Sequence, residues 1–295
     1  MALDNEDVVS VIVPVLDNQA GINLLLDALH TQTWPVDRLE VLVVDNGSMP
    51  PISTPTASAV LVRCVICSTP GSYAARNAGA EMAKGQILAF TDADCMPERN
   101  WVAAGVDALR SHGKKAVVGG EVAFQASDRA TAIEVYQRLT GFQQKENISQ
   151  RGFSATANLF VARSQFASIG GFDESLLSGG DREWCWRARN KGFLLEYAED
   201  ARVTTHARTS LRGAIRQARR VAGGRFMLKR KGDRHISPRG LEPHRGLLAA
   251  TKWICTHPSL SAAERLKVFG VASILKCAQS LETLRLRIGL RAERR

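Results

Sequence analysis

The stretch Ile87-Leu-Ala-Phe-Thr-Asp-Ala-Asp-Cys95 constrains the fold more than any other, because an apolar run ends abruptly in two carboxylates one residue apart. Such a run is typical of a strand that is buried on both faces. Open α/β sheets bind ligands beyond the carboxyl ends of their strands, and hard divalent cations prefer oxygen ligands. Asp92 and Asp94 are therefore candidate metal ligands at a sheet edge. The motif alone is short, and a strand followed by a polar turn is the structural alternative.

The first 91 residues alternate between strand-like and helix-like patterns. Runs rich in β-branched residues predict buried strands, and apolar side chains three or four residues apart predict helices. Gly85 is expected to end the second helix, and a Pro- and Ser-rich loop is expected at residues 50–56. This alternation with short loops predicts a nucleotide-binding α/β half. Strands are expected at residues 9–15, 39–45, 60–67 and 86–91, and helices at 20–32 and 72–84.

The remainder of the chain repeats these patterns less regularly. Two adjacent glycines, Gly119 and Gly120, predict a bulge within a strand. A polar, mobile loop is expected at residues 145–154 and a charged loop at 231–245, and residues 260–290 predict one or two helices with an apolar stripe. Strands are expected at residues 115–124, 155–163 and 193–206, and helices at 100–112, 130–144, 180–189 and 210–230.

Charge is distributed unevenly along the chain. From residue 201 onward there are 22 Lys and Arg against 5 Asp and Glu, a net charge of +17, whereas the first 200 residues carry 17 and 24, a net charge of −7. An acidic body with a basic tail is expected to meet phosphate in a nucleic acid, an anionic membrane surface or a phosphorylated substrate. Charge alone does not choose among them.

Several motifs and segments are absent from the sequence. No Gly-x-Gly-x-x-Gly follows the first strand and no Gly-x4-Gly-Lys-Ser/Thr occurs, which argues against a dehydrogenase and a P-loop enzyme. No run of 18 apolar residues is present, and the first residues are acidic and lack a signal pattern. We therefore expect a cytoplasmic protein, with the inner face of the cell membrane as its candidate location.

Six stretches in a fixed order give the chain a family resemblance. Together they resemble glycosyltransferase family 2, whose members have the GT-A fold, and the resemblance covers roughly residues 8–210. It implies an α/β/α sandwich with a mixed, mainly parallel sheet, followed here by a basic helical extension. The stretches are Val9-Ser-Val-Ile-Val-Pro-Val15, Val43-Val-Asp-Asn-Gly-Ser48, Pro70-Gly-Ser-Tyr-Ala-Ala-Arg-Asn-Ala-Gly79, Gly85–Asp94, Gly170-Gly-Phe-Asp-Glu174 and Gly179-Gly-Asp-Arg-Glu-Trp-Cys-Trp-Arg187.

The resemblance implies transfer of one sugar from a UDP-, GDP- or TDP-linked donor to a hydroxyl acceptor, with inversion. Asp45 and Arg76 would contact the nucleotide base. Asp92 would meet the ribose, or the metal through water, and Asp94 would ligate Mg²⁺ or Mn²⁺ at the diphosphate. His206 is a candidate further metal or diphosphate contact. The remaining residues expected to line the donor pocket are Pro14, Val15 and Asp17.

The same resemblance assigns the acceptor side. Asp181 matches the general base, a carboxylate that takes the proton of the attacking hydroxyl, and Glu183 is the reserve candidate. Asn158, Gly180 and Trp184 are expected beside the acceptor. The acceptor itself is expected to be a glycan or a lipid-linked glycan precursor. By resemblance, we expect residues 1–95 to form the nucleotide-sugar half, 96–210 the acceptor and catalytic half, and 211–295 the extension.

The chain departs from the family pattern in three places. Gly180-Asp181 replaces the usual Glu-Asp, Leu16-Asp17 replaces Tyr-Asn, and Asn46 replaces an aspartate. The first departure bears on the base and the other two on the nucleotide. Gln217-Ala-Arg-Arg220 lacks the tryptophan of processive members, so transfer of a single sugar is predicted.

Two other classes remain as alternatives. A sugar nucleotidyltransferase would share the sheet and the metal aspartates, but Pro14-Val-Leu-Asp-Asn18 stands where its Gly-rich phosphate loop belongs. A non-enzymatic protein would be a scaffold that has lost activity or a nucleic-acid-binding module, and the few aromatic residues in the basic tail argue against the latter. The sequence leaves the donor sugar, the linkage and the oligomeric state open.

Overall fold

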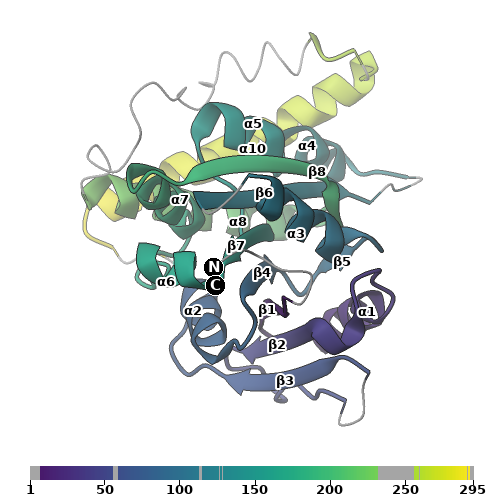
Figure 1. Ribbon diagram of the computed structural model, residues 1–295. Helices are drawn as coiled ribbons and strands as arrows, with labels where there is room; N and C mark the ends of the chain where they lie inside the picture. The colour runs from purple at the N-terminus through teal and green to yellow at the C-terminus, as the bar shows by residue number, and fades with distance from the viewer. Residues whose placement is uncertain are drawn as a thin grey trace.

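One mixed sheet runs through the protein, and helices cover both of its faces (Figure 1). The computed structural model describes residues 7–55, 59–112, 115–125, 127, 129–231, 256–258, 260–290 and 292. Within these residues the sheet has eight strands in the order β3-β2-β1-β4-β7-β6-β8-β5. The predicted α/β/α architecture with a mixed sheet is confirmed.

The first half of the chain forms the parallel part of the sheet. β1 pairs with β2 and β4, and β2 pairs with β3, all in parallel. Every residue of β2 and β4 is buried, in keeping with their apolar and β-branched sequences. Because these strands run in parallel, their carboxyl ends meet at one edge. The strands are β1 (Val9–Val15), β2 (Leu39–Asp45), β3 (Leu61–Ile66) and β4 (Ile87–Thr91).

The second half extends the sheet with both strand directions. β7 runs antiparallel to β4 and β6, β8 runs parallel to β6, and the short β5 runs antiparallel to the end of β8. Cys95 therefore lies opposite Thr205, which brings the residues after β4 beside the residues after β8. These strands are β5 (Cys95–Pro97), β6 (Ala116–Phe124), β7 (Asn158–Ala162) and β8 (Leu194–Thr205).

Two apolar cores lie on the two faces of the sheet. One contains side chains of α1 and α3 and is filled by Trp101 and Phe160, and the other contains side chains of α2, α6 and α7 and is filled by Phe90 and Trp184. Full burial of such side chains stabilises the fold by about 1.5–3 kcal/mol each. The helices are α1 (Gln19–His30), α2 (Ser72–Met82), α3 (Trp101–Ser111), α6 (Arg163–Ile169) and α7 (Gly180–Asn190), and η1 (Val36–Arg38) is a 3-10 turn.

Four further helices complete the described structure. α10 packs along α8 and α4 through small clusters around Ala214, Ala218, Val271 and Leu275. Among the described helices, none is both long and apolar enough to cross a bilayer. The four are α4 (Ala132–Thr140), α5 (Gln144–Arg151), α8 (Leu211–Arg230) and α10 (Ala262–Arg287), so residues 262–287 form a single helix.

Two local predictions are wrong. Residues 145–154 are not a mobile loop, because α5 occupies most of them, and the buried Gln144 side chain donates to the Gly120 carbonyl at 3.1 Å and the Ser154 hydroxyl at 3.0 Å. Gly85 does not end α2, which stops at Met82. A Cβ at Gly85 would lie 2.7 Å from the Ser10 backbone nitrogen, so this glycine permits close packing on β1.

The bulge predicted at the double glycine is confirmed. The register of β6 against β8 shifts between Gly120 and Glu121. A Cβ at Gly120 would lie 2.1 Å from the Ala201 carbonyl oxygen, so only glycine allows β8 to approach this closely.

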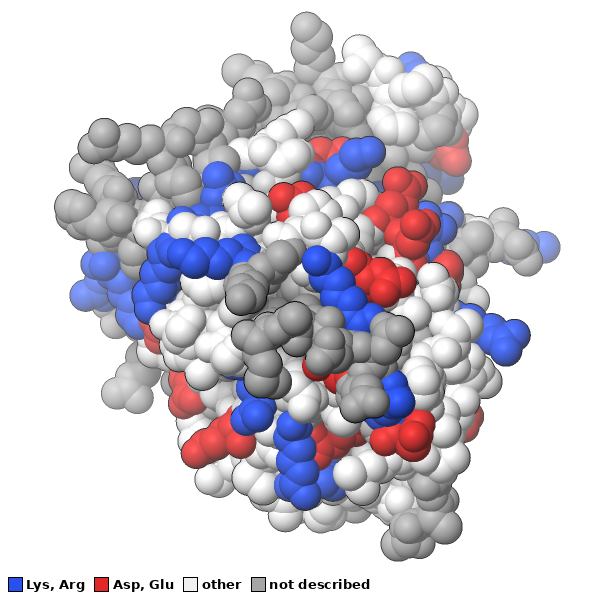
Figure 2. All heavy atoms as spheres, in the orientation of Figure 1, with Lys and Arg blue, Asp and Glu red and all other residues white. Residues whose placement is uncertain are grey.

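The sheet and both cores cross the boundary expected at residues 95 and 96. We therefore propose that residues 1–95 and 96–210 are functional halves of one folding unit. The charged loop expected at 231–245 lies outside the described residues, apart from Lys231. Basic side chains gather at the left of the face in Figure 2, at about mid-height, whereas both signs mix over its lower half.

Candidate active site

Three aspartates converge at the carboxyl edge of the parallel strands. Asp17 follows β1, Asp45 ends β2, and Asp92 follows β4. β1 lies between β2 and β4, with Val15 opposite Asp45, so the three strand ends are neighbours. Pro14 and Val15 end β1 beside the last residues of β2.

Asp45 and Asp17 shape the loop that follows β2. The buried Asp45 carboxylate accepts hydrogen bonds from the backbone amides of Ser48 at 2.8 Å and Ile52 at 2.9 Å. Burial opposes ionisation, but these hydrogen bonds lower the pKa of Asp45 below its usual value. Asp17, with a positive φ of 53°, accepts from the Met49 amide at 2.9 Å. The structure thus gives both carboxylates a loop-holding role at the rim of the predicted nucleotide pocket.

Arg76 links α2 to the end of β4. It is almost completely buried, and its guanidinium forms an ion pair with Asp92. The guanidinium also lies 5.8 Å from the centre of the Tyr73 ring. Asp92 is therefore held by a cation from the neighbouring helix.

Among the aspartates described for this site, Asp94 accepts the fewest hydrogen bonds from the protein. No other described residue donates a hydrogen bond to it, and one face of it is exposed to solvent. The protein around it and the like charge of Asp92 raise the pKa of Asp94, while Arg208 and His206 oppose that shift. Two close carboxylates, of which only Asp92 forms an ion pair among the described residues, make a site that a divalent ion would complete.

Cys95 lies in the same cluster. Ligand atoms of Asp92, Asp94 and Cys95 lie within 4.8 Å of one another. Burial raises the pKa of the Cys95 thiol well above its usual value, so the sulfur stays protonated. The residues present therefore fit a hard cation held by the two aspartates, without the sulfur.

Asp181 enters the site from α7. Gly179, in a left-handed conformation with φ of 81°, starts this helix and places Asp181 in its first turn. The Asp181 carboxylate accepts from the Arg182 amide at 2.8 Å and from the Tyr73 hydroxyl in a long hydrogen bond of 3.4 Å. Burial and the Asp181 charge raise the pKa of Tyr73, so the phenol remains a donor.

Gly180 explains one departure from the family pattern. A Cβ at this position would lie 2.7 Å from the Tyr73 ring. The ring therefore fills the space that a glutamate at position 180 would need. The lack of an acidic side chain next to Asp181 and the position of the Tyr73 ring therefore have one cause, the close packing of Gly180 on the ring.

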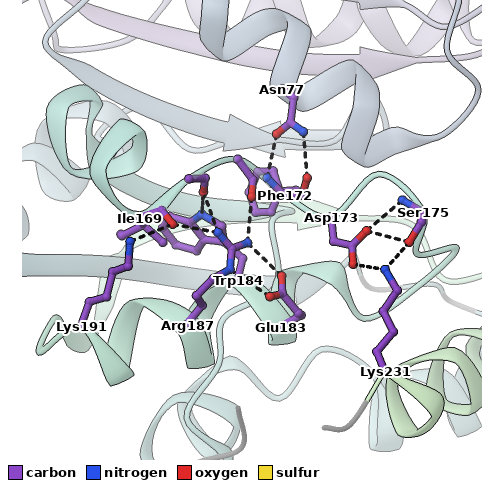
Figure 3. Close-up of polar contacts among 12 residues, drawn as sticks. Asn77, Ile169, Phe172, Asp173, Ser175, Glu183, Trp184, Arg187, Lys191 and Lys231 are labelled. Carbon is purple, nitrogen blue, oxygen red and sulfur yellow. Dashed lines mark hydrogen bonds and ion pairs between the residues drawn. The ribbon is translucent and has the colours of Figure 1, made fainter. Parts of the chain in front are cut away.

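Glu183 is engaged elsewhere on α7. Both of its oxygens accept from Arg187 at 2.9 Å, and Arg187 also donates to the carbonyls of residues 169–171 (Figure 3). This buried fork holds α7 against the loop before it. Asn77 fastens the same loop to α2 through the backbone of Phe172, at 2.8 and 2.9 Å. Glu183 thus supports the frame that carries Asp181.

Asn158 and Trp184 lie inside the protein, away from any acceptor surface. Asn158 is 0% exposed, and its amide donates to the carbonyls of Glu121 and Ala201 at 2.8 Å and accepts from the Trp101 indole at 2.9 Å. Trp184 is also 0% exposed and donates to the Gly170 carbonyl at 2.8 Å. Both support the site from behind and present no atom to an acceptor.

Two arginines near the aspartates were not identified from the sequence. Arg208 acts on the charge of Asp94, and Arg220 acts on Arg208 and on the Tyr73 phenol. His206, Arg208 and their neighbours line an open hollow of about 690 Å³. The only sequence signal was the run of arginines in residues 208–220, which also suits a solvated helix face.

The strand order and the two sets of carboxylates define a glycosyltransferase of the GT-A class. The family model for glycosyl transferase family 2 matches residues 10–163, and that for glycosyl transferase family group 2 matches residues 87–278. The chain belongs to glycosyl transferase family 2 and is an enzyme of that kind. The predicted family and enzyme class are confirmed.

Curated relatives and solved structures agree with this assignment. Glycosyltransferase AglE of Haloferax volcanii is 38% identical over 75% of this chain and 73% of its own length. Pre-mycofactocin glycosyltransferase of Mycobacterium tuberculosis is 28% identical over 70% of this chain but only 44% of its own length.

Among solved structures, the mannosyltransferase PcManGT from Pyrobaculum calidifontis, in complex with GDP-Man and Mn²⁺, has a TM-score of 0.64 at 20% identity. It covers 96% of this chain and 89% of its own. Staphylococcus aureus TarS 1-349 has a TM-score of 0.51 at 14% identity and covers 97% and 93%. These two likenesses show the fold.

Proposed function

We propose that this enzyme transfers one sugar from a nucleotide-sugar donor to a hydroxyl acceptor by a single displacement with inversion. The observation that carries the proposal is the series of contacts Asp181–Tyr73–Arg76–Asp92, which joins a carboxylate on α7 to the aspartate pair at the sheet edge. A base and a diphosphate site that are connected in this way suit a single displacement. The acceptor hydroxyl would attack the anomeric carbon of the sugar from one side, and the diphosphate would leave from the other.

The donor would bind at the edge formed by β1, β2 and β4. The similar structures that carry GDP-Man, UDP or UDP-GlcNAc support a nucleotide-sugar donor. In this chain the loop held by Asp17 and Asp45 would form the wall beside the base, and Arg76 would fix the edge through Asp92. UDP, GDP and TDP remain the candidate nucleotides.

The aspartate pair would hold Mg²⁺ or Mn²⁺, with Asp94 as the direct ligand and Asp92 as a direct or water-mediated one. When bound, such an ion neutralises negative charge on a departing diphosphate. Arg208 adds positive charge beside Asp94, which would help to hold the same phosphates, and His206 is a further candidate contact.

Asp181 would accept the proton of the attacking hydroxyl. Tyr73 occupies one oxygen of its carboxylate, which leaves the other to face the acceptor. Glu183 is a poor substitute because both of its oxygens bind Arg187. A covalent intermediate would need a second carboxylate on the other face of the donor, and the described residues of the site offer none.

We further propose a glycan or a lipid-linked glycan precursor as the acceptor and an anionic membrane surface as the place of work. The basic extension supports this part of the proposal. It carries most of the excess of Lys and Arg, and α8 of this extension also contributes Arg220 to the site.

Nucleotide release from a panel of UDP-, GDP- and TDP-sugars, with Mn²⁺ or with a chelator, tests the catalytic proposal. We expect metal-dependent release from one donor class and a loss of at least 100-fold in Asp94→Ala and in Asp181→Asn. Asp107→Asn, on the exposed face of α3, is the matched control and should retain wild-type turnover. Wild-type turnover in both active-site variants would refute the mechanism.

A further inference from the structure

Helix α10 is apolar on two faces, and within the described residues only one of them packs on the protein. The inner face buries Val268, Val271, Leu275 and Leu286, mainly against α8 and α4. This half of the apolar stripe accounts for the attachment of the helix. The other half needs a separate explanation.

The outer face presents large apolar side chains to solvent. Leu266, Leu281, Leu284 and Ile288 are 74%, 63%, 57% and 70% exposed. Positions 277, 281, 284 and 288 recur every three or four residues, so they share one side of the helix. A run of exposed apolar side chains along one helix indicates a surface that meets another phase or partner.

A basic groove lies directly beside this stripe, between α8 and α10. Its volume is about 640 Å³, and Leu284 and Phe226 form its apolar part. Its lining contains no carboxylate, and within the described part of the chain none of its cations forms an ion pair. The cations are Arg225, Lys229, Arg230, Lys276 and Arg287.

The acidic groups of α10 are turned away from the groove. Glu282 is 1% exposed and pairs with Arg219 and Arg285, and Glu264 caps the start of the helix through Ser261. A solvated helix face usually carries alternating charges that pair along it. Among the described residues, no carboxylate pairs with the positive charge of the groove, which lies beside apolar side chains.

We infer that the α8–α10 groove and the outer face of α10 dock on an anionic phospholipid bilayer. The groove cations would hold lipid phosphates, and Leu281, Leu284 and Ile288 would enter the boundary of the acyl chains. A second copy of the chain fits less well, because a symmetric contact would place two positive grooves against each other.

This inference deepens the proposed membrane contact and does not depend on the catalytic proposal. It also gives the membrane a position relative to the site. α8 carries Lys229 of the groove and Arg220 of the site, and its end is tied by Lys231 to Asp173, just before α7 (Figure 3). The docking surface and the site therefore share helix α8.

Cosedimentation of the full chain with vesicles tests this inference. One set of vesicles contains equal parts of phosphatidylglycerol and phosphatidylcholine, and the other contains phosphatidylcholine alone. We expect binding to the first set at low salt, weaker binding at high salt, and little binding to the second. Absence of binding to the anionic vesicles would overturn the inference.

Two variants and a control locate the surface. Lys229→Gln/Lys276→Gln/Arg287→Gln should weaken partitioning by roughly 100-fold, since each cation near the surface contributes about fivefold. Lys84→Gln/Arg99→Gln/Lys115→Gln removes the same charge from exposed positions elsewhere and should bind vesicles like the wild type. Equal losses in both triple variants would show that net charge alone acts and would overturn the groove.

Leu281→Gln/Leu284→Gln should lose the salt-resistant part of the binding. Sedimentation equilibrium without vesicles tests whether a second copy of the chain binds this surface instead. If the wild type is a dimer, this variant is a monomer and the wild type binds no vesicles, the inference is refuted. Nucleotide release by each variant on a water-soluble donor and acceptor should be unchanged, which separates this test from that of the catalytic proposal.

Discussion

At the scale of single residues, the site depends on contacts between side chains that are far apart in the sequence. Asp181 and Tyr73 are separated by 108 positions, and Arg76 meets Asp92 across 16. Motif patterns singled out Asp92, Asp94, Asp181 and Arg76 as candidates, because each stands in a recognisable stretch. Tyr73 could not be singled out, since only the packing of α2 against α7 reveals what its hydroxyl reaches.

Tyr73→Phe tests the positioning of Asp181. The ring is almost buried and phenylalanine fits its space, so the variant should fold normally. Loss of a hydrogen bond to a charged group is worth about 1.5–3 kcal/mol, and this one is long, so kcat should fall roughly tenfold. KM for the donor should not change, as measured by initial rates. A raised donor KM with an unchanged kcat would contradict the positioning role.

Gly180→Ala tests the packing between position 180 and Tyr73. The new Cβ would press on the ring at 2.7 Å, and overpacking of this kind costs about 1–3 kcal/mol in the free energy of unfolding. Urea denaturation should show this loss in the wild-type background. In a chain that already carries Tyr73→Ser, adding Gly180→Ala should cost little further stability, because the ring is gone. Purely additive losses in the double variant would contradict the packing.

At the scale of elements, strands were predictable and polar segments were not. The continuous apolar, β-branched sequences of β1, β2 and β4 predict strands, because parallel strands bury both faces. α5 is polar throughout and resembles a loop, yet tertiary hydrogen bonds of Gln144 fix it as a helix. The stripe of α10 was visible in the sequence, but which half of it packs inward depends on α8 and α4.

Glu40 on β2 gives the sheet a pH dependence. It is 2% exposed and accepts hydrogen bonds from the Lys84 amide at 2.9 Å, the Ser10 hydroxyl at 2.6 Å and Arg63 at 2.7 Å. Burial alone would raise the pKa of Glu40, but these contacts together lower it below 4.5. A carboxyl with a lowered pKa stabilises the fold above its unfolded value, and that contribution is lost as the pH falls through the folded value.

Glu40→Gln should therefore lower the free energy of unfolding at neutral pH by about 1–3 kcal/mol. Urea titrations of both proteins at several pH values should show the difference shrinking below about pH 4.5, where Glu40 becomes protonated in the unfolded chain, until the pH falls through the lower pKa of Glu40 in the folded protein. A difference that stays constant down to pH 3 would show that the charge of Glu40 does not stabilise the sheet.

At the scale of the whole molecule, one sheet spans the two proposed functional halves, and a basic helical extension follows it. In this proposal the nucleotide half supplies Asp92 and Asp94, the second half supplies Asp181, and α8 of the extension adds Arg220. The family stretches occur in a fixed series, which is why the sequence suggested this division. The charge asymmetry was equally plain, but only the structure shows cations and apolar side chains together in one groove.

Calorimetric titration of UDP and GDP into the protein, with Mn²⁺ and with a chelator, tests the division of labour between the two carboxylate sites. We expect one nucleotide to bind the wild type in a metal-dependent way. Asp94→Ala should lose that dependence, whereas Asp181→Asn should bind like the wild type while its turnover falls at least 100-fold. Metal-dependent binding that survives in Asp94→Ala, or is lost in Asp181→Asn, would contradict the account.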